Sequence, residues 1–264
     1  MNRIQKKFEQ LHTTGKKAIV PYITPEFPFK GITLDLLRAC KEAGADMVEV
    51  GIPFSDPLAD GPTIQHSSHV ALSNGVTMSS ILDIVREFRR QSEIPIILMG
   101  YVNPMFRRGY ERFTAEASSA GVDGLIVPDL PPEEGFELKK ACESAGLSIV
   151  FLIAPTTPDE RMKRIDLLST DFTYCVSVTG VTGSRESIGT NGSLDRFLQR
   201  VRLNVKKPFV VGFGISNSDQ VRNVCRYADG AVVGSALIDA IGKAHNPAEA
   251  IDHTKRFLLS LSPS

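Results

Sequence analysis

The chain has 264 residues, of which 42% are hydrophobic and 23% are charged, an ordinary globular composition. Its 30 basic and 30 acidic residues cancel, so no overall field argues for binding to nucleic acid or to an anionic membrane. There is no apolar run long enough for a transmembrane helix, and residues 1–10 lack the apolar core of a signal peptide. The four cysteines are far apart, which favours buried free thiols in a reducing cytoplasm over disulfides or a metal site.

Residues 1–10 instead have the pattern of a short amphipathic helix. After them, eight apolar, β-rich runs recur at about one per 33 residues, the size of one βα unit. The runs are nearly continuous in apolar residues, which indicates parallel strands covered on both faces. They are residues 18–23, 45–50, 95–98, 124–127, 148–153, 172–178, 208–212 and 230–234.

Segments with helical periodicity lie between these runs, and several end in Ala-Gly just before the next strand, where glycine suits a left-handed C-cap. The segments are residues 32–43, 81–90, 113–120, 133–145, 159–168, 194–203, 219–227 and 248–261.

Eight such units without a break in composition predict an α/β fold, a single (β/α)8 TIM barrel over residues 1–264 with an extra N-terminal helix. The alternative is an open doubly wound sheet, which usually carries a G-x-G-x-x-G turn after its first strand. Here that strand is followed by Thr24-Pro25-Glu26, without such a turn. In a barrel the chemistry lies at the carboxyl ends of the strands and in the loops that follow.

Glu49 interrupts the second apolar run, and alternation along a strand places it on the face opposite Val48 and Val50. If the valines meet the helices, Glu49 points into the barrel near its upper end. A buried carboxyl group without a partner has a raised pKa and can act as a general acid or base near neutral pH. No strand run offers an Arg or Lys for a core ion pair, so we favour a catalytic role over a structural one.

The loop after this strand, residues 52–62, is long for a βα connection and contains three prolines. Asp60-Gly61 suits a tight turn, and Pro62 suits the start of a helix. Asp60 is therefore either a turn or N-cap residue, or a second carboxylate above the barrel mouth, opposite Glu49. The loop by itself favours neither interpretation.

Three consecutive strand runs end in glycine-rich segments, at residues 178–185, 212–217 and 230–236. Small residues let backbone N–H groups approach an anion, and a helix that starts there adds its positive N-terminal dipole. A phosphate site formed by the last two strand loops and a short extra helix recurs in this fold, and Ser235 can open such a helix. Glycines that merely punctuate tight loops are the alternative, but three such ends on one rim favour phosphate.

Three further features are less specific. The segment 179–192 is long and rich in glycine, serine and threonine, which suits either a lid that excludes water or a passive connection. Tyr174 is either plain core or a side chain whose hydroxyl reaches toward Glu49. His66 and His69 are three apart on a predicted helix, but no third ligand lies nearby, so no metal site is expected.

The motif EVGIPFSDPLADGP at residues 49–62 closely resembles the most distinctive signature of the alpha chain of tryptophan synthase. The resemblance continues in order along nearly the whole chain. The further segments are PDLPPEE at 128–134, APTTPDER at 154–161, VSVTGVTGSR at 176–185 and GFGIS at 212–216. The first motif is very specific, whereas the glycine-rich ends fit many phosphate-binding barrels.

This resemblance implies a retro-aldol cleavage of indole-3-glycerol phosphate to indole and glyceraldehyde 3-phosphate, a step of L-tryptophan biosynthesis that needs no metal or organic cofactor. Glu49 would be the principal acid–base group, and Asp60 would hold the indole N–H and stabilise charge on the ring. Tyr174 would support Glu49, and Thr182 would belong to the closing lid. Phosphate binding is implied for Gly183, Gly212, Gly214, Gly234 and Ser235, and an indole pocket for Tyr22, Ile126, Ile153 and Phe213.

The same resemblance implies a partner. Alpha chains of this family pair with a beta chain that carries pyridoxal phosphate, in an α2β2 heterotetramer through which indole passes. The loop around Pro53, Asp56 and Pro57 would face the beta chain. Pyridoxal phosphate itself would not bind to this chain.

Some residues depart from the family pattern. The family often has Gly-Asp after the first strand, where this chain has residues 24–28, and Tyr22 stands where Phe is common. Met99-Gly100 is also unusual. These changes alter the shape of the pocket or the stiffness of loops but leave both carboxylates in place.

Two other functions are weighed against this one. The first is another phosphosugar barrel, an isomerase or epimerase with one carboxylate base. The second is a barrel without activity of its own that activates a beta chain. The second predicts the loss of a carboxylate or of the phosphate glycines, and neither is lost.

Overall fold

The computed structural model describes residues 2–176, 192–212 and 214–261. Its strands form one sheet in the order β5-β4-β3-β2-β1-β9-β8-β7-β6, and all the paired neighbours are parallel. The strands are β1 Ala18–Ile23, β2 Val48–Gly51, β3 Ile96–Met99, β4 Gly124–Ile126, β5 Ser148–Val150, β6 Leu152–Ile153, β7 Thr173–Val176, β8 Phe209–Gly212 and β9 Gly230–Val233.

The sheet closes through a single stretch of chain. The fifth predicted strand is divided at Phe151 into β5, which pairs with β4, and β6, which pairs with β7. These two short strands are the two ends of the sheet, and Phe151 alone separates them. The predicted (β/α)8 barrel is therefore confirmed, with one of its eight strands in two pieces.

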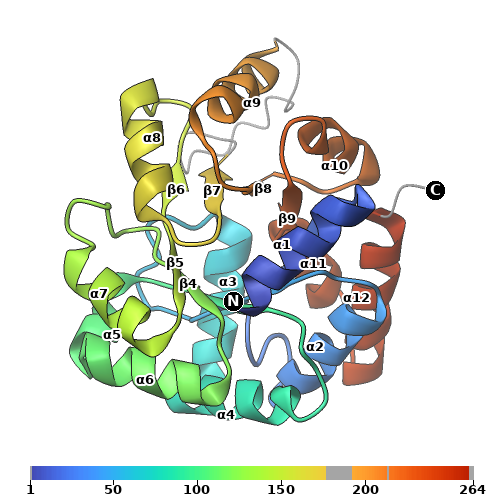
Figure 1. The fold of residues 1–264 in the computed structure, drawn as a ribbon. Coiled ribbons are helices and arrows are strands. Elements are labelled where there is room, and N and C mark those ends of the chain that lie inside the picture. The colour runs from blue at the N-terminus through green and yellow to red at the C-terminus, as the bar shows by residue number, and fades with distance from the viewer. Residues whose placement is uncertain (1, 177–191, 213, 262–264) are drawn as a thin grey trace.

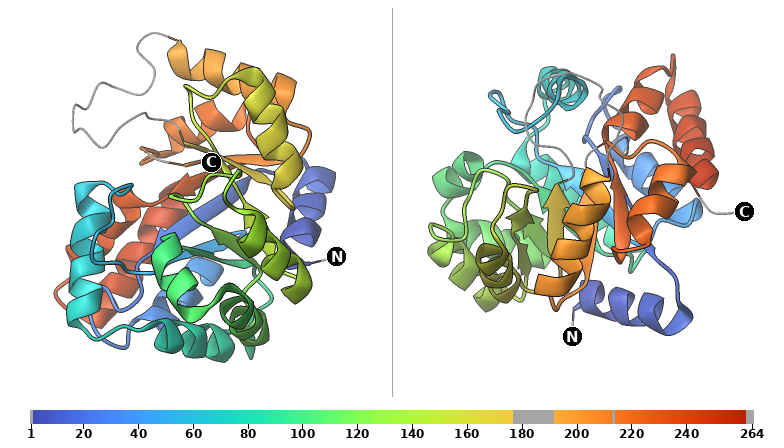
Figure 2. Two further views of the ribbon diagram at one scale, coloured as in Figure 1. Left: turned by 90° about the vertical axis from the view of Figure 1, so that its left-hand side faces the viewer. Right: turned by 90° about the horizontal axis from the view of Figure 1, so that it is seen from above.

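Helices surround this barrel, as the ribbon views show (Figure 1, Figure 2). The predicted helical segments are all present, with ends shifted by a few residues, and α3, α5 and α11 join them. The helices are α2 Thr33–Glu42, α3 Pro62–Ser73, α4 Met78–Arg89, α5 Val102–Arg108, α6 Tyr110–Ala120, α7 Phe136–Ala145, α8 Asp159–Leu168, α9 Ser193–Asn204, α10 Ser218–Cys225, α11 Ser235–Gly242 and α12 Pro247–Leu261.

The apolar core has two parts, one on each side of the barrel wall. Val48 and Val50 belong to the outer part, which fills the space between strands and helices. Met47, Ile97 and Val210 belong to the inner part, inside the barrel. Because side chains alternate along each strand, neighbouring residues of one strand contribute to different parts.

The remaining helix, α1 Arg3–Thr14, covers the amino ends of the strands, and it crosses in front of them in Figure 1. Its apolar stripe of Ile4, Phe8 and Leu11 is buried in the inner core. The Asn2 side chain accepts a hydrogen bond from the Gln5 N–H and so caps the first turn. The extra N-terminal helix is confirmed, and it seals the end of the barrel opposite the strands' carboxyl ends.

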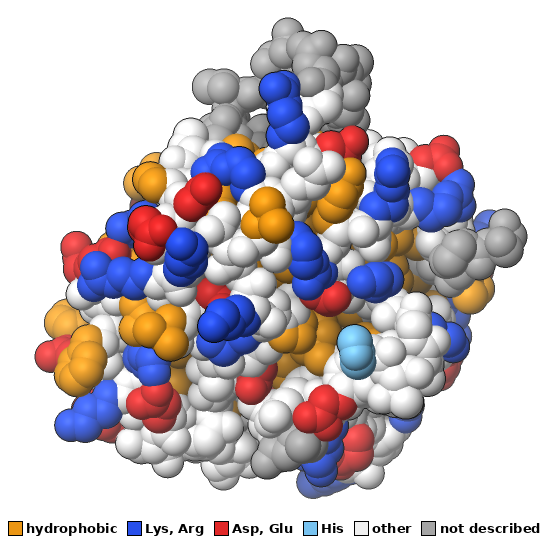
Figure 3. Space-filling model, turned by 45° about the horizontal axis from the view of Figure 1, so that its top comes forward, with side chains coloured by type: hydrophobic (Ala, Val, Ile, Leu, Met, Phe, Trp, Pro, Cys, Tyr) orange, Lys and Arg blue, Asp and Glu red, His pale blue; other side chains and the backbone are white. Residues whose placement is uncertain are grey.

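The surface carries charges of both signs. On the face shown in Figure 3, basic and acidic side chains are interspersed, as the balanced composition suggests. Within the described residues, each helix is too short or too polar to cross a lipid bilayer.

The seal formed by α1 leads to a matched pair of stability predictions. Leu11→Ala should lower the free energy of unfolding by about 3 kcal/mol, because it leaves a cavity among buried side chains. Leu203→Ala makes the same chemical change on α9, where the side chain is 84% exposed, and should cost less than about 0.5 kcal/mol. Urea unfolding followed by circular dichroism measures both. Equal losses would show that α1 is not part of the core.

Candidate active site

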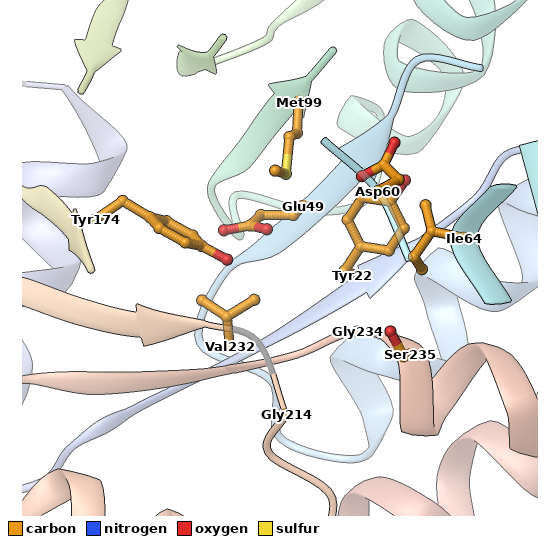
Figure 4. Close-up of a pocket in the computed structure, with 10 residues that line it drawn as sticks. All are labelled: Tyr22, Glu49, Asp60, Ile64, Met99, Tyr174, Gly214, Val232, Gly234 and Ser235. Carbon is orange, nitrogen blue, oxygen red and sulfur yellow. The ribbon is translucent and has the colours of Figure 1, made fainter. Parts of the chain in front are cut away.

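A cavity lies at the carboxyl ends of the strands, and it brings together seven of the side chains and glycines singled out in the sequence (Figure 4). Its lining comes from β1, β2, β3, β7 and β9 and from the segments that follow β2, β8 and β9. The lining residues are Tyr22, Glu49, Asp60, Ile64, Met99, Tyr174, Gly214, Val232, Gly234 and Ser235.

Glu49 stands inside the barrel wall, as its alternation with the two outward valines predicts. It lies on β2 between Tyr22 of β1 and Ile97 of β3 in the strand register. Only 1% of the residue is exposed, and neither carboxyl oxygen has a hydrogen-bond partner in the described part of the chain. Burial alone raises the pKa of the Glu49 carboxyl to about 8. Glu49 is therefore a neutral acid at pH 7, with a proton to give.

Asp60 reaches the same cavity from the loop between β2 and α3, and it is only partly buried. The Tyr101 hydroxyl donates a hydrogen bond to its Oδ2 atom over 3.1 Å. Burial raises the pKa of the Asp60 carboxyl to about 6, and the bond from Tyr101 opposes that rise. Of the two interpretations that the sequence left open, the structure favours the second, a carboxylate above the barrel mouth.

The two carboxyl groups thus differ in protonation over a useful range of pH. Between about pH 6 and pH 8, Asp60 is ionised while Glu49 still holds its proton. Environments that separate the pKa values of two carboxyl groups in one site assign one as acid and the other as anion. The cavity is therefore equipped to donate a proton at one point and to stabilise positive charge at another.

Two tyrosines narrow the cavity around Glu49. In Figure 4 the Glu49 carboxyl group points toward the Tyr174 hydroxyl, and Asp60 lies near the Tyr22 ring. Burial, with the nearby carboxyl groups, raises the pKa of both phenols, so both stay protonated. The predicted place of Tyr174 beside Glu49 agrees with the structure.

Each tyrosine lies over a glycine of the neighbouring strand. A Cβ atom on Gly51 would come within 2.0 Å of the Tyr22 hydroxyl oxygen. A Cβ atom on Gly212 would come within 1.8 Å of the Tyr174 hydroxyl oxygen. Gly212 does not line the cavity, and its place against Tyr174 gives it a packing role in addition to the phosphate contact that its motif predicts.

The N-terminus of α11 faces the cavity through Gly234 and Ser235. This is the short extra helix expected near the phosphate site. The first N–H groups of a helix have no partner inside it, and the helix dipole favours an anion there. Gly214 lies beside this helix end with φ of 78°, a conformation in which a side chain is strained. The structure thus brings these three residues to one rim of the cavity, and their contact with phosphate stays a prediction.

The remaining predicted pocket residues are not all brought to the cavity. Ile126 is buried in the inner core and does not line it. Ile153 packs in the outer core, toward the helices, because the interior position on β6 belongs to Leu152. For Ile153 the structure therefore argues against an indole contact. The predictions for Thr182, Gly183 and Phe213, and for the lid at 179–192 apart from Gly192, lie outside the described residues.

The loop predicted to face a partner has an exposed tip. Pro53 is buried, Pro57 is partly buried and Asp56 is exposed. Leu58, which the sequence analysis did not single out, is 82% exposed at this tip.

Sequence reasoning also missed four residues of the site. Three of them supply apolar lining: Met99 and Val232 from interior positions near the ends of β3 and β9, and Ile64 from the start of α3. Tyr101 is the fourth, and its position just after the end of β3 is a signal for the site. Among the described residues, no group of three or more His, Cys, Asp or Glu side chains is placed to hold a metal ion.

A parallel barrel with an acid, an anion and a helix N-terminus on one rim defines an acid–base enzyme that acts on a phosphorylated substrate. Comparison with known proteins narrows this class. A family model described as "Tryptophan synthase alpha chain" matches residues 8–261. The chain belongs to the tryptophan synthase alpha chain family.

Individual relatives match over nearly their whole length. The tryptophan synthase alpha chain of Chlorobium luteolum is 47% identical, with 97% of this chain and 96% of the relative covered. The alpha chain of Roseiflexus castenholzii is 47% identical, with 98% of each covered. The crystal structure of tryptophan synthase subunit alpha from Legionella pneumophila superposes with a TM-score of 0.89 at 36% identity, covering 99% of this chain and 97% of that chain.

The reaction follows from membership of this family. The protein is a carbon–carbon lyase of tryptophan biosynthesis, the alpha subunit that cleaves indole-3-glycerol phosphate to indole and glyceraldehyde 3-phosphate.

The burial of Glu49 generates a prediction about stability. The pKa of this carboxyl rises from 4.5 to about 8 on folding, so the folded chain keeps a proton that the unfolded chain releases. Stability should therefore fall as pH rises from about 4.5 to about 8. Glu49→Gln removes this dependence. The difference in free energy of unfolding, variant minus wild type, should therefore increase by up to about 5 kcal/mol as pH rises over that range.

Urea unfolding of both proteins at pH 5 and pH 8 measures the change. Asp60 titrates in both proteins, so its contribution cancels in the difference. A difference that stays constant between the two pH values would show that Glu49 is ionised in the folded protein at neutral pH.

Proposed function

We propose that Glu49 and Asp60 divide the cleavage of indole-3-glycerol phosphate between them, with Glu49 as the acid–base group and Asp60 as the anion that holds the indole ring. The observation that carries this proposal is the common cavity, in which a buried neutral acid, a carboxylate and a helix N-terminus converge. Acid–base chemistry of this kind uses side chains alone.

The proton of Glu49 is delivered to C3 of the indole ring. The ring then carries a positive charge, which spreads to its nitrogen, and ionised Asp60 accepts the N–H hydrogen bond and stabilises that charge. The resulting Glu49 carboxylate removes the proton of the glycerol hydroxyl next to the ring. The carbon–carbon bond breaks, its electron pair returns to the ring, and the hydroxyl becomes the aldehyde of glyceraldehyde 3-phosphate.

The substrate phosphate would bind at the N-terminus of α11, with Gly234 and Ser235 as its nearest contacts and Gly214 beside them. Fixing the phosphate on this rim sets the glycerol chain across the cavity. Tyr22 and the apolar lining from β3 and β9 then enclose the ring. Tyr174, whose hydroxyl lies near Glu49, would orient the acid.

A beta chain is the proposed partner. A chain from the tryptophan synthase α2β2 complex of Pyrococcus furiosus superposes on this one with a TM-score of 0.85 at 43% identity, covering 92% of this chain and 97% of that chain. The exposed tip of the loop after β2, with Asp56 and Leu58, would contact the beta chain. Pyridoxal phosphate would be bound by that partner alone.

Glu49→Gln tests the assignment of the acid. The amide keeps the shape of the side chain but has no proton to transfer, so kcat should fall by about 1,000-fold or more. Indole release from indole-3-glycerol phosphate, with and without a beta chain, measures the loss. The variant should fold and bind the beta chain as the wild type does. Undiminished indole production by a folded variant would remove Glu49 from the mechanism.

The pH dependence tests the division of labour. Below about pH 6 Asp60 is protonated and no longer an anion, and above about pH 8 Glu49 has lost its proton. A plot of kcat/KM against pH should therefore be bell-shaped, with limbs near these two values, because kcat/KM reports the free enzyme. Asp60→Asn should reduce kcat/KM by about 100-fold and remove the acidic limb.

A sugar-phosphate isomerase with a single carboxylate base makes a different prediction. It needs an ionised base, so its activity should rise through the pKa of Glu49 rather than fall. Conversion of a sugar phosphate, together with a failure to release indole, would establish that alternative.

A further inference from the structure

Tyr101 occupies a fixed position just outside the cavity. It follows β3 after a single glycine and stands at the start of α5, with 6% of its surface exposed. Its ring stacks on Phe54, with ring centroids 5.2 Å apart and planes 28° from parallel. The phenol is therefore held by packing before any polar contact is made.

The Tyr101 hydroxyl makes two hydrogen bonds to consecutive residues of the loop after β2. It accepts one from the Ala59 N–H over 2.9 Å and lies 3.1 Å from Oδ2 of Asp60. A backbone N–H can only donate, so the phenol oxygen is the acceptor toward Ala59. Its own proton is left for Asp60. The direction of the second bond is thus fixed by the first, and it stabilises the ionised carboxylate.

We propose that Tyr101 is a positioning residue, which keeps Asp60 ionised and aimed into the cavity without touching the substrate. The inference rests on the proposed role of Asp60. Tyr101 itself does not line the cavity, whereas Asp60 does. The same phenol oxygen also ties the exposed loop tip to the end of β3 through Ala59, so the carboxylate cannot turn outward while both bonds are intact.

The other groups around Asp60 do not replace this bond. Tyr22 of β1, Tyr174 of β7, Glu49 of β2 and Ser235 of α11 share its cavity. Glu49 is neutral over the range in which Asp60 titrates, so it adds no charge there. Within the described residues, no Lys or Arg forms an ion pair with Asp60, and Tyr101 makes the one hydrogen bond to its carboxylate.

Tyr101→Phe is the test, because it removes the hydroxyl and keeps the ring that stacks on Phe54. The acidic limb of the kcat/KM profile should move up by about one pH unit, since the carboxylate loses a charge-assisted hydrogen bond. At pH 6 this corresponds to about a fivefold loss of kcat/KM, which shrinks as pH rises. The alkaline limb, set by Glu49, should stay near pH 8.

Two further variants complete the experiment. Tyr110→Phe makes the same chemical change on α6, away from Asp60, and should leave both limbs in place. Phe54→Leu loosens the stack and keeps the hydroxyl, so it should move the acidic limb in the same direction by less. It also carries the test if Tyr101→Phe does not fold, which thermal unfolding will show.

The outcomes separate this inference from the function on which it rests. An acidic limb that does not move in Tyr101→Phe, with activity lost in Asp60→Asn, overturns the positioning role alone. Full activity in Asp60→Asn overturns the proposed role of Asp60 itself. A loss of kcat/KM that is equal at every pH would make Tyr101 a merely structural residue.

Discussion

Among the described residues, no group hydrogen-bonds to either oxygen of the buried Glu49 carboxyl group, and the rest of the site is arranged around that constraint. An ionised carboxylate there would lose its hydration without compensation, so the group keeps its proton until about pH 8. A flexible segment would relieve the cost by turning the side chain outward. Glu49 instead stands on β2, held in register by β1 and β3. The closed barrel is what makes a neutral acid available at pH 7.

Asp60 differs from Glu49 because a loop, not a strand, carries it. It is only partly buried, and the bond from Tyr101 favours its ionised form, so its pKa rises less, to about 6. A rigid strand and an anchored loop thus place two chemically identical groups in opposite protonation states. The α11 N-terminus lies on the same rim, where the substrate phosphate is proposed to bind. Distance from water, more than charge pairing, sets the chemistry of this cavity.

The elements that follow from local pattern could be predicted. Continuous apolar runs predicted the parallel barrel, and the alternation of Glu49 with Val48 and Val50 predicted that the Glu49 side chain points inward. Elements that depend on which strands are neighbours in the sheet could not be predicted. The division of β5 from β6 reflects a change of neighbour at Phe151, which no pattern within one strand records. Helix α5 has seven residues including Pro104, too few to show a helical period.

The glycines show how far the site could be predicted from the sequence. The motif around Gly212 marks a missing side chain but not what fills the space, and the structure shows the Tyr174 hydroxyl there. Gly51 admits the Tyr22 hydroxyl in the same way. Both phenols come from the strand next to the glycine, β7 beside β8 and β1 beside β2. Together the two phenols narrow the space above Glu49, so they help to exclude water and to sustain the raised pKa of Glu49 on which the proposed proton transfer depends.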